Sequence, residues 1–234
     1  MNFNEILKQL SEGELSGEFA GLRGSGAVAP RHIPRVVTFT NEALTRLCTR
    51  FPLVTKSLIL ETQEGKMTYP IDSKYAESNY DSQSGVIPYI KDGANPYKDD
   101  MIKITSVFAK FGRKLPMNDS NQQWSVYTPS PLTLQVPKSY QNYALGITYQ
   151  AKHPVITEDL DCEQEIIIPD VLVPALLAYV GYKHCFSRST PESQAMAAAF
   201  KNVFEEICVE TTLFDTANSS ITETKTLFEQ RGFK

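Results

Sequence analysis

Residues 166–186 read IIIPDVLVPALLAYVGYKHCF and decide the fold, because they join a helix-starting signal to a dense apolar run. The Asp170 side chain can cap the first free amides of a helix, and Pro174 falls in the first turn, where a missing N–H costs little. The apolar residues follow the i, i+3, i+4, i+7, i+8 spacing of a buried helix face. They are Leu172, Ala175, Leu176, Tyr179 and Val180. The stretch therefore predicts a helix packed against a partner.

A second, longer helix is predicted after a short link at residues 187–190. Thr190 is its expected N-cap, and the helix should run from Pro191 to Phe214. Its apolar side should consist of Phe200, Val203, Phe204, Ile207, Cys208 and Thr211. Because the link is short, the two helices should pack antiparallel.

An earlier helix is predicted over residues 38–51, TFTNEALTRLCTRF. Thr40 or Asn41 can cap its free amides, Glu42 lies in the first turn, and Pro52 ends the helix. Its apolar stripe is Leu44, Leu47, Cys48 and Phe51. We expect this helix to join the two C-terminal helices in one bundle.

Between residues 54 and 155 the pattern becomes strand-like. The runs KSLILET and KMTYPI flank Gln63-Glu64-Gly65 and predict a β-hairpin. Residues 72–100 are rich in Ser, Asn, Asp and Tyr and predict a long loop. The other strand candidates alternate approximately, as antiparallel strands with one solvated face do. They are residues 86–90, 101–108, 123–127, 132–136 and 145–149.

The N-terminal segment predicts a short helix followed by a glycine-rich arm. Residues 3–10 would form about two turns with one apolar face, too short to be stable alone in water. That face, formed by Phe3, Ile6, Leu7 and Leu10, must dock on its own domain or on a neighbouring subunit. Residues 11–34 form either a pliant arm that reaches another subunit or an ordinary frayed terminus.

The C-terminal residues 215–234 are mostly polar, with Leu227, Phe228 and Phe233 as spaced apolar points. The predicted fold class is therefore α+β: an antiparallel bundle of about three to four helices with a β-rich antiparallel insertion and extended terminal arms. The expected division is 1–36 (helix and flexible arm), 37–53 with 166–214 (bundle), 54–155 (β-rich insertion) and 215–234 (tail).

Composition excludes several classes of protein. With 41% hydrophobic residues the chain of 234 can build a core, and a net charge of −4 without a Lys/Arg cluster argues against a dedicated nucleic-acid reader. The sequence shows no secretory signal and no run of about 18 apolar residues that would span a membrane. The four cysteines are far apart, so we expect free thiols in a protein made in a cytoplasm.

Catalytic signatures such as GxSxG, a Walker loop or HExxH are absent from the sequence. His153 with Asp159, Asp161 and Glu163 is an imaginable metal set, but such an acidic run is more often a solvated loop. His184 and Cys185 point about 100° apart on a helix and should pack in the bundle. We expect no enzyme and no cofactor, with a small metal-dependent enzyme as one alternative.

An aromatic group in the β-rich region suggests a second alternative, a host- or carbohydrate-binding module. A stacking platform for single-stranded nucleic acid or sugar would normally add clustered basic residues, and here only Lys138 and Lys152 lie near. Core packing or a subunit interface is therefore favoured. The group is Trp124, Tyr127, Tyr140, Tyr143 and Tyr149.

The order of these parts resembles the head-to-tail adaptor (neck or connector) proteins of tailed bacteriophages, in particular the podovirus-like type. The resemblance covers most of the chain. It rests on the helix NEALTRLCTRF, the β-rich phrases KSLILE and MIKITSVF, the lead-in LGITYQAKHPVI…IIIPDVLVPALLAYVGYKHCF, the long helix after it and the polar tail.

The resemblance implies a virion structural protein in the neck, made in the host cytoplasm. It implies a ring, commonly of twelve subunits, that docks under the portal, extends the DNA channel without sequence-specific binding and supports a tail or nozzle protein, with no membrane contact. The tail would contact the portal through Leu227, Phe228 and Phe233. The apolar face of residues 3–10 is the expected subunit contact.

Overall fold

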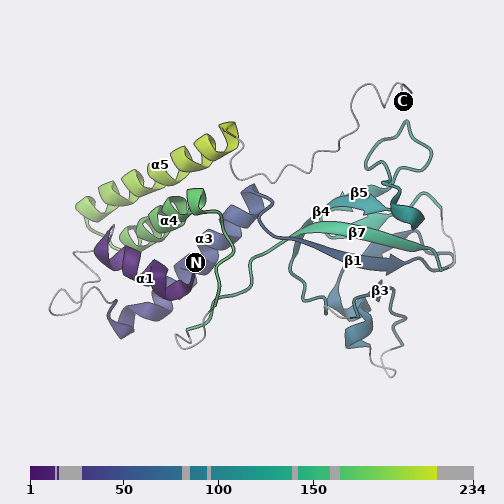
Figure 1. Cartoon of the computed structure of the whole chain (residues 1–234), viewed down its shortest axis with the longest axis horizontal. Helices are drawn as coiled ribbons and strands as arrows, with labels where there is room; N and C mark the ends of the chain where they lie inside the picture. The colour runs from purple at the N-terminus through teal and green to yellow at the C-terminus, as the bar shows by residue number, and fades with distance from the viewer. Residues whose placement is uncertain are drawn as a thin grey trace.

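The computed structural model describes residues 1–13, 15, 28–80, 85–93, 96–138, 142–158 and 164–214. These residues form a helical body and a β body, each around its own hydrophobic core, which follow one another along the long axis (Figure 1). The helices are α1 Phe3–Glu12, α3 Ile33–Arg50, α4 Val173–Phe186 and α5 Pro191–Leu213. The strands are β1 Thr55–Glu61, β2 Thr68–Pro70, β3 Ile90–Lys91, β4 Met101–Phe108, β5 Tyr127–Ser130, β6 Thr133–Gln135 and β7 Ala144–Ala151. The predicted α+β class is confirmed.

The apolar helix α4 is the centre of the helical body, where it packs against α1, α3 and α5. This position explains why its sequence is hydrophobic nearly all round. In Figure 1, α4 and α5 lie side by side. A Cβ added at Gly181 would lie 3.3 Å from the ring of Phe200, so the glycine permits the close approach of these two helices. The helix pair predicted from the sequence is thus confirmed.

Two predicted helix starts are wrong. Helix α3 begins at Ile33, with a proline in its first turn, so Thr40 and Asn41 lie inside the helix and cap nothing. Asp170 opens a short 3₁₀ turn, Asp170–Leu172, and α4 begins only after it. In α3 the burial of Val36 and Val37 extends the helix beyond the cap-like residues, because tertiary packing outweighs local capping preference.

The start of α5 agrees with its prediction. Thr190 is the N-cap, its hydroxyl oxygen accepts from the Ser193 N–H at 3.3 Å, and Pro191 is the first helical residue. Phe204, Cys208 and Thr211 are buried as predicted, whereas Val203 is exposed.

The β body contains two antiparallel sheets, ordered β3-β1-β7-β4 and β2-β6-β5. Strands β1 and β2 lie in different sheets, so the predicted hairpin between them is wrong. Gly65 does adopt the positive φ of a turn, 75°, but the turn carries the chain from one sheet to the other. Tyr69 of β2 pairs instead with Leu134 of β6, and both side chains are fully buried.

The described residues of the segment 72–100 are largely irregular, as predicted, but several of their side chains belong to the β core. It holds two 3₁₀ turns, Ser73–Tyr75 and Glu77–Asn79, and the short strand β3. The Asp92 carboxylate links two parts of this segment, because it accepts from the backbone N–H of Ser78 at 3.0 Å and from that of Tyr97 at 2.8 Å. Burial would raise the pKa of Asp92, but these hydrogen bonds hold it below its ordinary value.

Candidate functional site

The four residues predicted to contact a neighbouring subunit are buried in the core of their own chain. A capping box fixes the start of α1: the Asn2 side chain accepts from the Glu5 N–H at 2.9 Å, and the Glu5 carboxylate accepts from the Asn2 N–H at 3.0 Å. The apolar face, Phe3, Ile6, Leu7 and Leu10, is at most 8% exposed. The sequence left docking on the same domain or on a neighbour open. The structure shows the first, and a subunit contact through this face stays a prediction.

Several predicted site residues lie outside the described part of the chain. They are the portal-contact residues Leu227, Phe228 and Phe233, the acidic residues Asp159, Asp161 and Glu163, and Tyr140. Their predicted roles stay predictions.

His153 has a structural position. Its ring is 8% exposed, Nδ1 lies 2.7 Å from the Pro154 carbonyl oxygen, and Nε2 accepts from the Ile167 N–H at 3.0 Å. Both ring nitrogens thus hold backbone in the connection from β7 to α4. Burial lowers the pKa of this imidazole, which favours its neutral form. The imagined metal role of His153 has no support from this geometry, and the described residues contain no cluster of three His, Cys, Asp or Glu side chains arranged for a metal.

The described cysteines, Cys48, Cys185 and Cys208, are buried free thiols, as expected. Burial raises the pKa of Cys48, and it raises that of Cys208 to about 11. A thiol of high pKa is a poor nucleophile. His184, beside Cys185 on α4, is also buried, so both residues pack in the bundle as predicted.

A charged cleft crosses α3, α4 and α5. Glu42 is one of its lining residues, and the Glu42 Oε1 accepts from the Tyr179 hydroxyl at 2.8 Å and from Lys183 Nζ at 2.9 Å. Burial opposes ionisation of Glu42, but the hydrogen bonds lower its pKa overall. Arg50 pairs with Glu205 at 2.7 Å across α3 and α5. These partly exposed pairs join helices, and such pairs are each worth only about 1 kcal/mol or less.

The predicted aromatic group separates into core and surface. Tyr149 is buried in the β core and donates to Asp100 Oδ1 at 3.2 Å, whereas Trp124 is 45% exposed. Trp124 and Tyr143 line one pocket on the β body, and Tyr127 is not among its lining residues. The described tyrosines of this group therefore do not form the continuous stacking platform that was one of the two interpretations.

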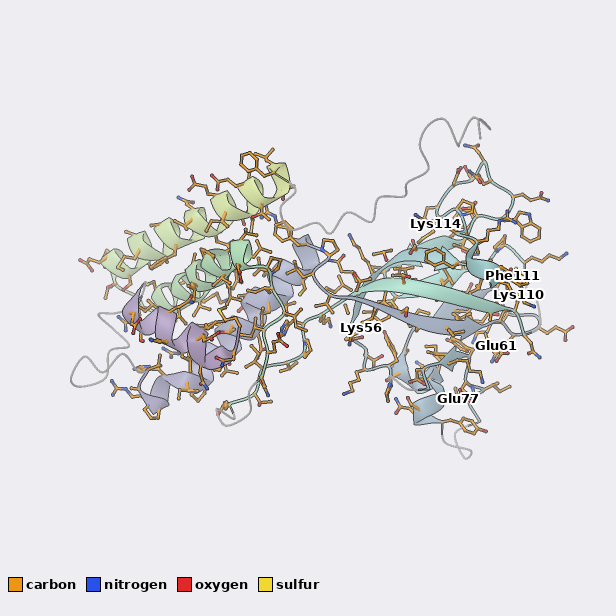
Figure 2. The ribbon with its side chains drawn as sticks, in the orientation of Figure 1. Lys56, Glu61, Glu77, Lys110, Phe111 and Lys114 are labelled. Carbon is orange, nitrogen blue, oxygen red and sulfur yellow. The ribbon has the colours of Figure 1, made fainter. Side chains whose placement is uncertain are left out.

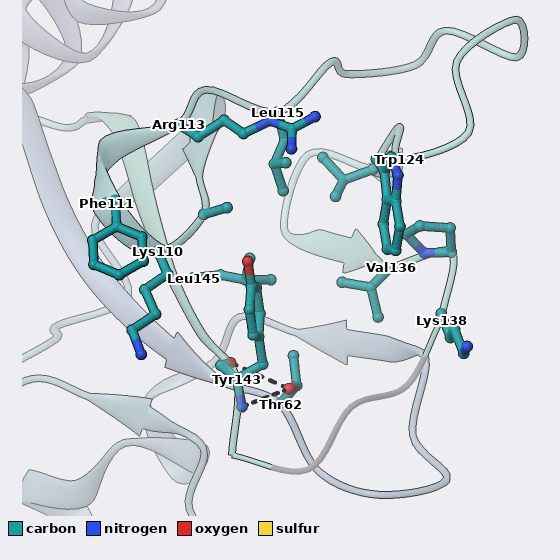
Figure 3. A pocket seen from close by; sticks show the side chains of 13 residues that line it. Thr62, Lys110, Phe111, Arg113, Leu115, Trp124, Val136, Lys138, Tyr143 and Leu145 are labelled. Carbon is teal, nitrogen blue, oxygen red and sulfur yellow. Dashed lines mark hydrogen bonds between the residues drawn. The ribbon is translucent and has the colours of Figure 1, made fainter.

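The pocket has an aromatic and aliphatic interior of about 450 Å³. Figure 3 shows Trp124 and Tyr143 on facing sides, with Val136 below Trp124. The backbone of Tyr143 is tied to the end of β1, because its carbonyl accepts from the Thr62 N–H at 2.9 Å and its N–H donates to the Thr62 hydroxyl at 3.1 Å. The other apolar lining residues are Ala109, Leu115, Val126, Pro137 and Leu145.

Three of the described lining residues are charged, and all three are cationic: Lys110, Arg113 and Lys138. A sugar site normally presents several convergent hydrogen-bonding groups, and the described lining contains no carboxylate or amide side chain. The pocket therefore suits an apolar or aromatic group that carries negative charge beside it.

Phe111 stands at the edge of the pocket on the tight turn after β4. Its ring is 95% exposed and its φ is +65°, a region that a bulky residue rarely adopts. Figure 2 shows Lys110, Phe111 and Lys114 together at this end of the β body. Sequence reasoning singled out Trp124 and Tyr143 but missed Phe111 and Arg113. The run Lys110-Phe111-Gly112-Arg113-Lys114, a lone aromatic among basic residues beside a glycine, was the signal that could have found them.

None of the described helices has the length and hydrophobicity that a membrane span needs.

Comparison with known proteins gives the family. Residues 13–222 match the model of a family described as SU10 adaptor protein. These residues include most of the helical body and the whole β body. Among curated proteins, no sequence matches the chain. The family match spans far more than half of the 234 residues. The chain therefore belongs to the SU10 adaptor protein family and is a phage adaptor protein.

Proposed function

We propose that the protein is the head-to-tail adaptor of a tailed phage: it forms a ring under the portal, extends the DNA channel and supports the tail or nozzle. The observation that carries this proposal is the family match over residues 13–222. Membership of an adaptor family supports a location in the virion neck and a structural rather than an enzymatic role. A ring of twelve subunits is the expected form.

The two-body architecture supports a role between two different partners. The helical body and the β body have separate cores and lie at opposite ends of the long axis (Figure 1). Each end can therefore present its own surface to a partner. In our proposal the C-terminal segment that follows α5 contacts the portal, and the β body faces the tail or nozzle.

The charge balance supports passage of DNA without binding. The net charge is −4, and a surface of like charge repels a phosphate backbone rather than holding it. In the proposed ring, DNA passes through the channel without sequence-specific contacts.

The portal contact can be tested with the tail. Residues 215–234 hold few apolar side chains, and Leu227, Phe228 and Phe233 are the proposed anchors. We expect a chain truncated after Phe214 to keep the melting temperature of the full chain but to lose most of its portal binding, because a few apolar anchors often carry an interface. Co-sedimentation with purified portal and electron microscopy measure this.

The matched control replaces Ser219 and Ser220 in the same tail with alanine and should bind portal normally. We expect the isolated protein to be monomeric or weakly associated and to form rings only when a portal is present. Rings that assemble on portals equally well without residues 215–234 would move the portal contact to the helices. Failure of the full chain to bind any portal would contradict the adaptor proposal itself.

A further inference from the structure

The chemistry of the pocket beside Phe111 indicates which kind of ligand would fit it. Its interior is apolar, with Trp124 and Tyr143 placed to contact a flat ring from two sides (Figure 3), and the charged residues that the structure describes at its rim are cationic. Aromatic side chains buried in such pockets dominate many interfaces, and nearby carboxylates would complement Lys110 and Arg113. The fitting ligand is therefore an acidic peptide segment that presents an aromatic ring.

Phe111 adds an independent sign of a contact surface. A bulky residue rarely adopts positive φ, and such backbone strain is found preferentially at functional positions. Here the strain holds an almost fully exposed phenyl ring at the pocket edge. An exposed aromatic beside an apolar pocket enlarges the surface that a partner can bury.

The chain itself contains a segment of this chemistry. Residues 12–22, EGELSGEFAGL, carry Glu12, Glu14 and Glu18 beside Phe19 and include no Lys or Arg. The acidic run over residues 157–165 has no aromatic residue. The tail, residues 215–234, has phenylalanines but balances three acidic residues against three basic ones.

The glycine-rich arm cannot fill the pocket of its own chain. Leu15 and Val28, on either side of residues 16–27, are buried in the helical core. Twelve residues that leave and return reach roughly 20 Å from their anchors at about 3.4 Å per residue. From Val28 to the pocket the chain runs through α3, of roughly 27 Å, and β1, of roughly 23 Å. In Figure 1, α3 runs obliquely toward the β body and β1 continues along the long axis away from the helices. Thr62, at the far end of β1, lines the pocket.

We propose that this pocket receives the arm of a second copy of the chain, with the Phe19 ring between Trp124 and Tyr143 and with Glu14 and Glu18 facing Lys110 and Arg113. The contact joins the helical body of one subunit to the β body of the next. Because the two surfaces differ, the contact is head-to-tail, and repetition closes a ring when the rotation permits. This inference rests on the ring of the proposed function and adds the contact that links its subunits.

Trp124 is the only tryptophan of the chain, so intrinsic fluorescence reports on the pocket directly. The receptor is the full chain with Phe19→Ala, whose own arms cannot occupy it. The probe is a synthetic peptide of residues 11–22. We expect a saturable change in Trp124 fluorescence on titration with the peptide. The same peptide with Phe19→Ala should bind about tenfold or more weakly.

Charge is tested on the receptor. Adding Lys110→Ala and Arg113→Ala to the receptor should lower its affinity for the peptide at least several-fold. It should also make that affinity less dependent on salt concentration. The matched control Lys103→Ala, an exposed lysine of β4 outside the pocket lining, should bind like the parent. No fluorescence change with the arm peptide, or a stronger change with a peptide of residues 222–233, overturns the inference.

A second measurement separates the two proposals. Electron microscopy of the full chain on portals should show rings for the native sequence and fewer or open assemblies for Phe19→Ala. Peptide binding without any rings on portals upholds the pocket and contradicts the proposed function. Normal rings from Phe19→Ala, with no peptide binding, contradict the arm contact and leave the adaptor function standing.

Discussion

Replacing Gln150 with leucine should loosen the joint between the helical and β bodies. Gln150 lies in β7 and is 1% exposed. Its amide Nε2 donates to the carbonyl oxygens of Cys48 and Phe51 at the end of α3, the latter at 2.8 Å. In a continuing helix the Cys48 carbonyl would accept from residue 52, but Pro52 has no N–H. The Gln150 amide replaces that missing donor.

The cost follows from what each carbonyl loses. In Gln150→Leu the Cys48 carbonyl loses this amide donor, and leaving a buried group unsatisfied costs about 1–3 kcal/mol. The Phe51 carbonyl still accepts from the Leu53 N–H at 2.8 Å, so its loss is only a second bond, about 0.5–1.5 kcal/mol. Leucine fills much of the same volume, and we expect a net loss of about 2–4 kcal/mol in the free energy of unfolding.

Urea denaturation of the purified chain measures this loss. Trp124 fluorescence follows the β body, and far-ultraviolet circular dichroism follows chiefly the helices. The matched control Gln135→Leu changes an exposed glutamine of β6 and should stay within about 0.5 kcal/mol of the native protein. A Gln150→Leu protein as stable as this control would show that the α3 carbonyls have other donors, and the argument from Pro52 would be wrong.

Two further predictions concern the helical body and its connection to β7. Phe204→Ala should cost about 3–5 kcal/mol in thermal or chemical unfolding, because the ring is buried and meets Tyr179 edge-on at 5.2 Å. The exposed neighbour Val203→Ala should change stability by no more than about 0.5 kcal/mol, and equal effects would mean that the α4–α5 contact is misassigned. Burial lowers the folded-state pKa of His153 from 6.5, so its contribution to stability is present above about pH 6.5 and is lost as pH falls below it. Melting temperatures between pH 7.5 and 5 should therefore fall more steeply for the native protein than for His153→Gln, and parallel curves would refute this.

Elements governed by neighbouring residues could be predicted. The Thr190-Pro191 start of α5 and the strand Met101–Phe108 have the predicted bounds, because capping, proline position and alternation act within a few residues. The start of α3 could not be predicted in this way. Thr40 has a capping side chain, but in the fold it is completely buried within the helix. The helix begins earlier, at Ile33, because residues before Thr40 are buried against helices that are distant in the sequence.

The candidate site shows the same division. The sequence pointed to Trp124 and Tyr143, but Thr62, Arg113 and Val136 join them only because two sheets bring the ends of distant strands together. Phe111 was missed because its importance lies in its exposure and backbone conformation. A pattern of residue types records neither of these.

By itself the sequence determined the α+β class, the apolar helix pair and the free thiols of the three described cysteines, since these depend on composition and short-range periodicity. Tertiary structure alone decided which strands pair, how the α1 face is used and where the cationic pocket forms. Gln63–Gly65 provides a turn whether or not the strands beside it pair. Leu60 pairs with Leu145 of β7 and Tyr69 with Leu134 of β6, and all four side chains are buried there. Such pairings depend on the apolar surface that the whole chain buries, which no local segment specifies.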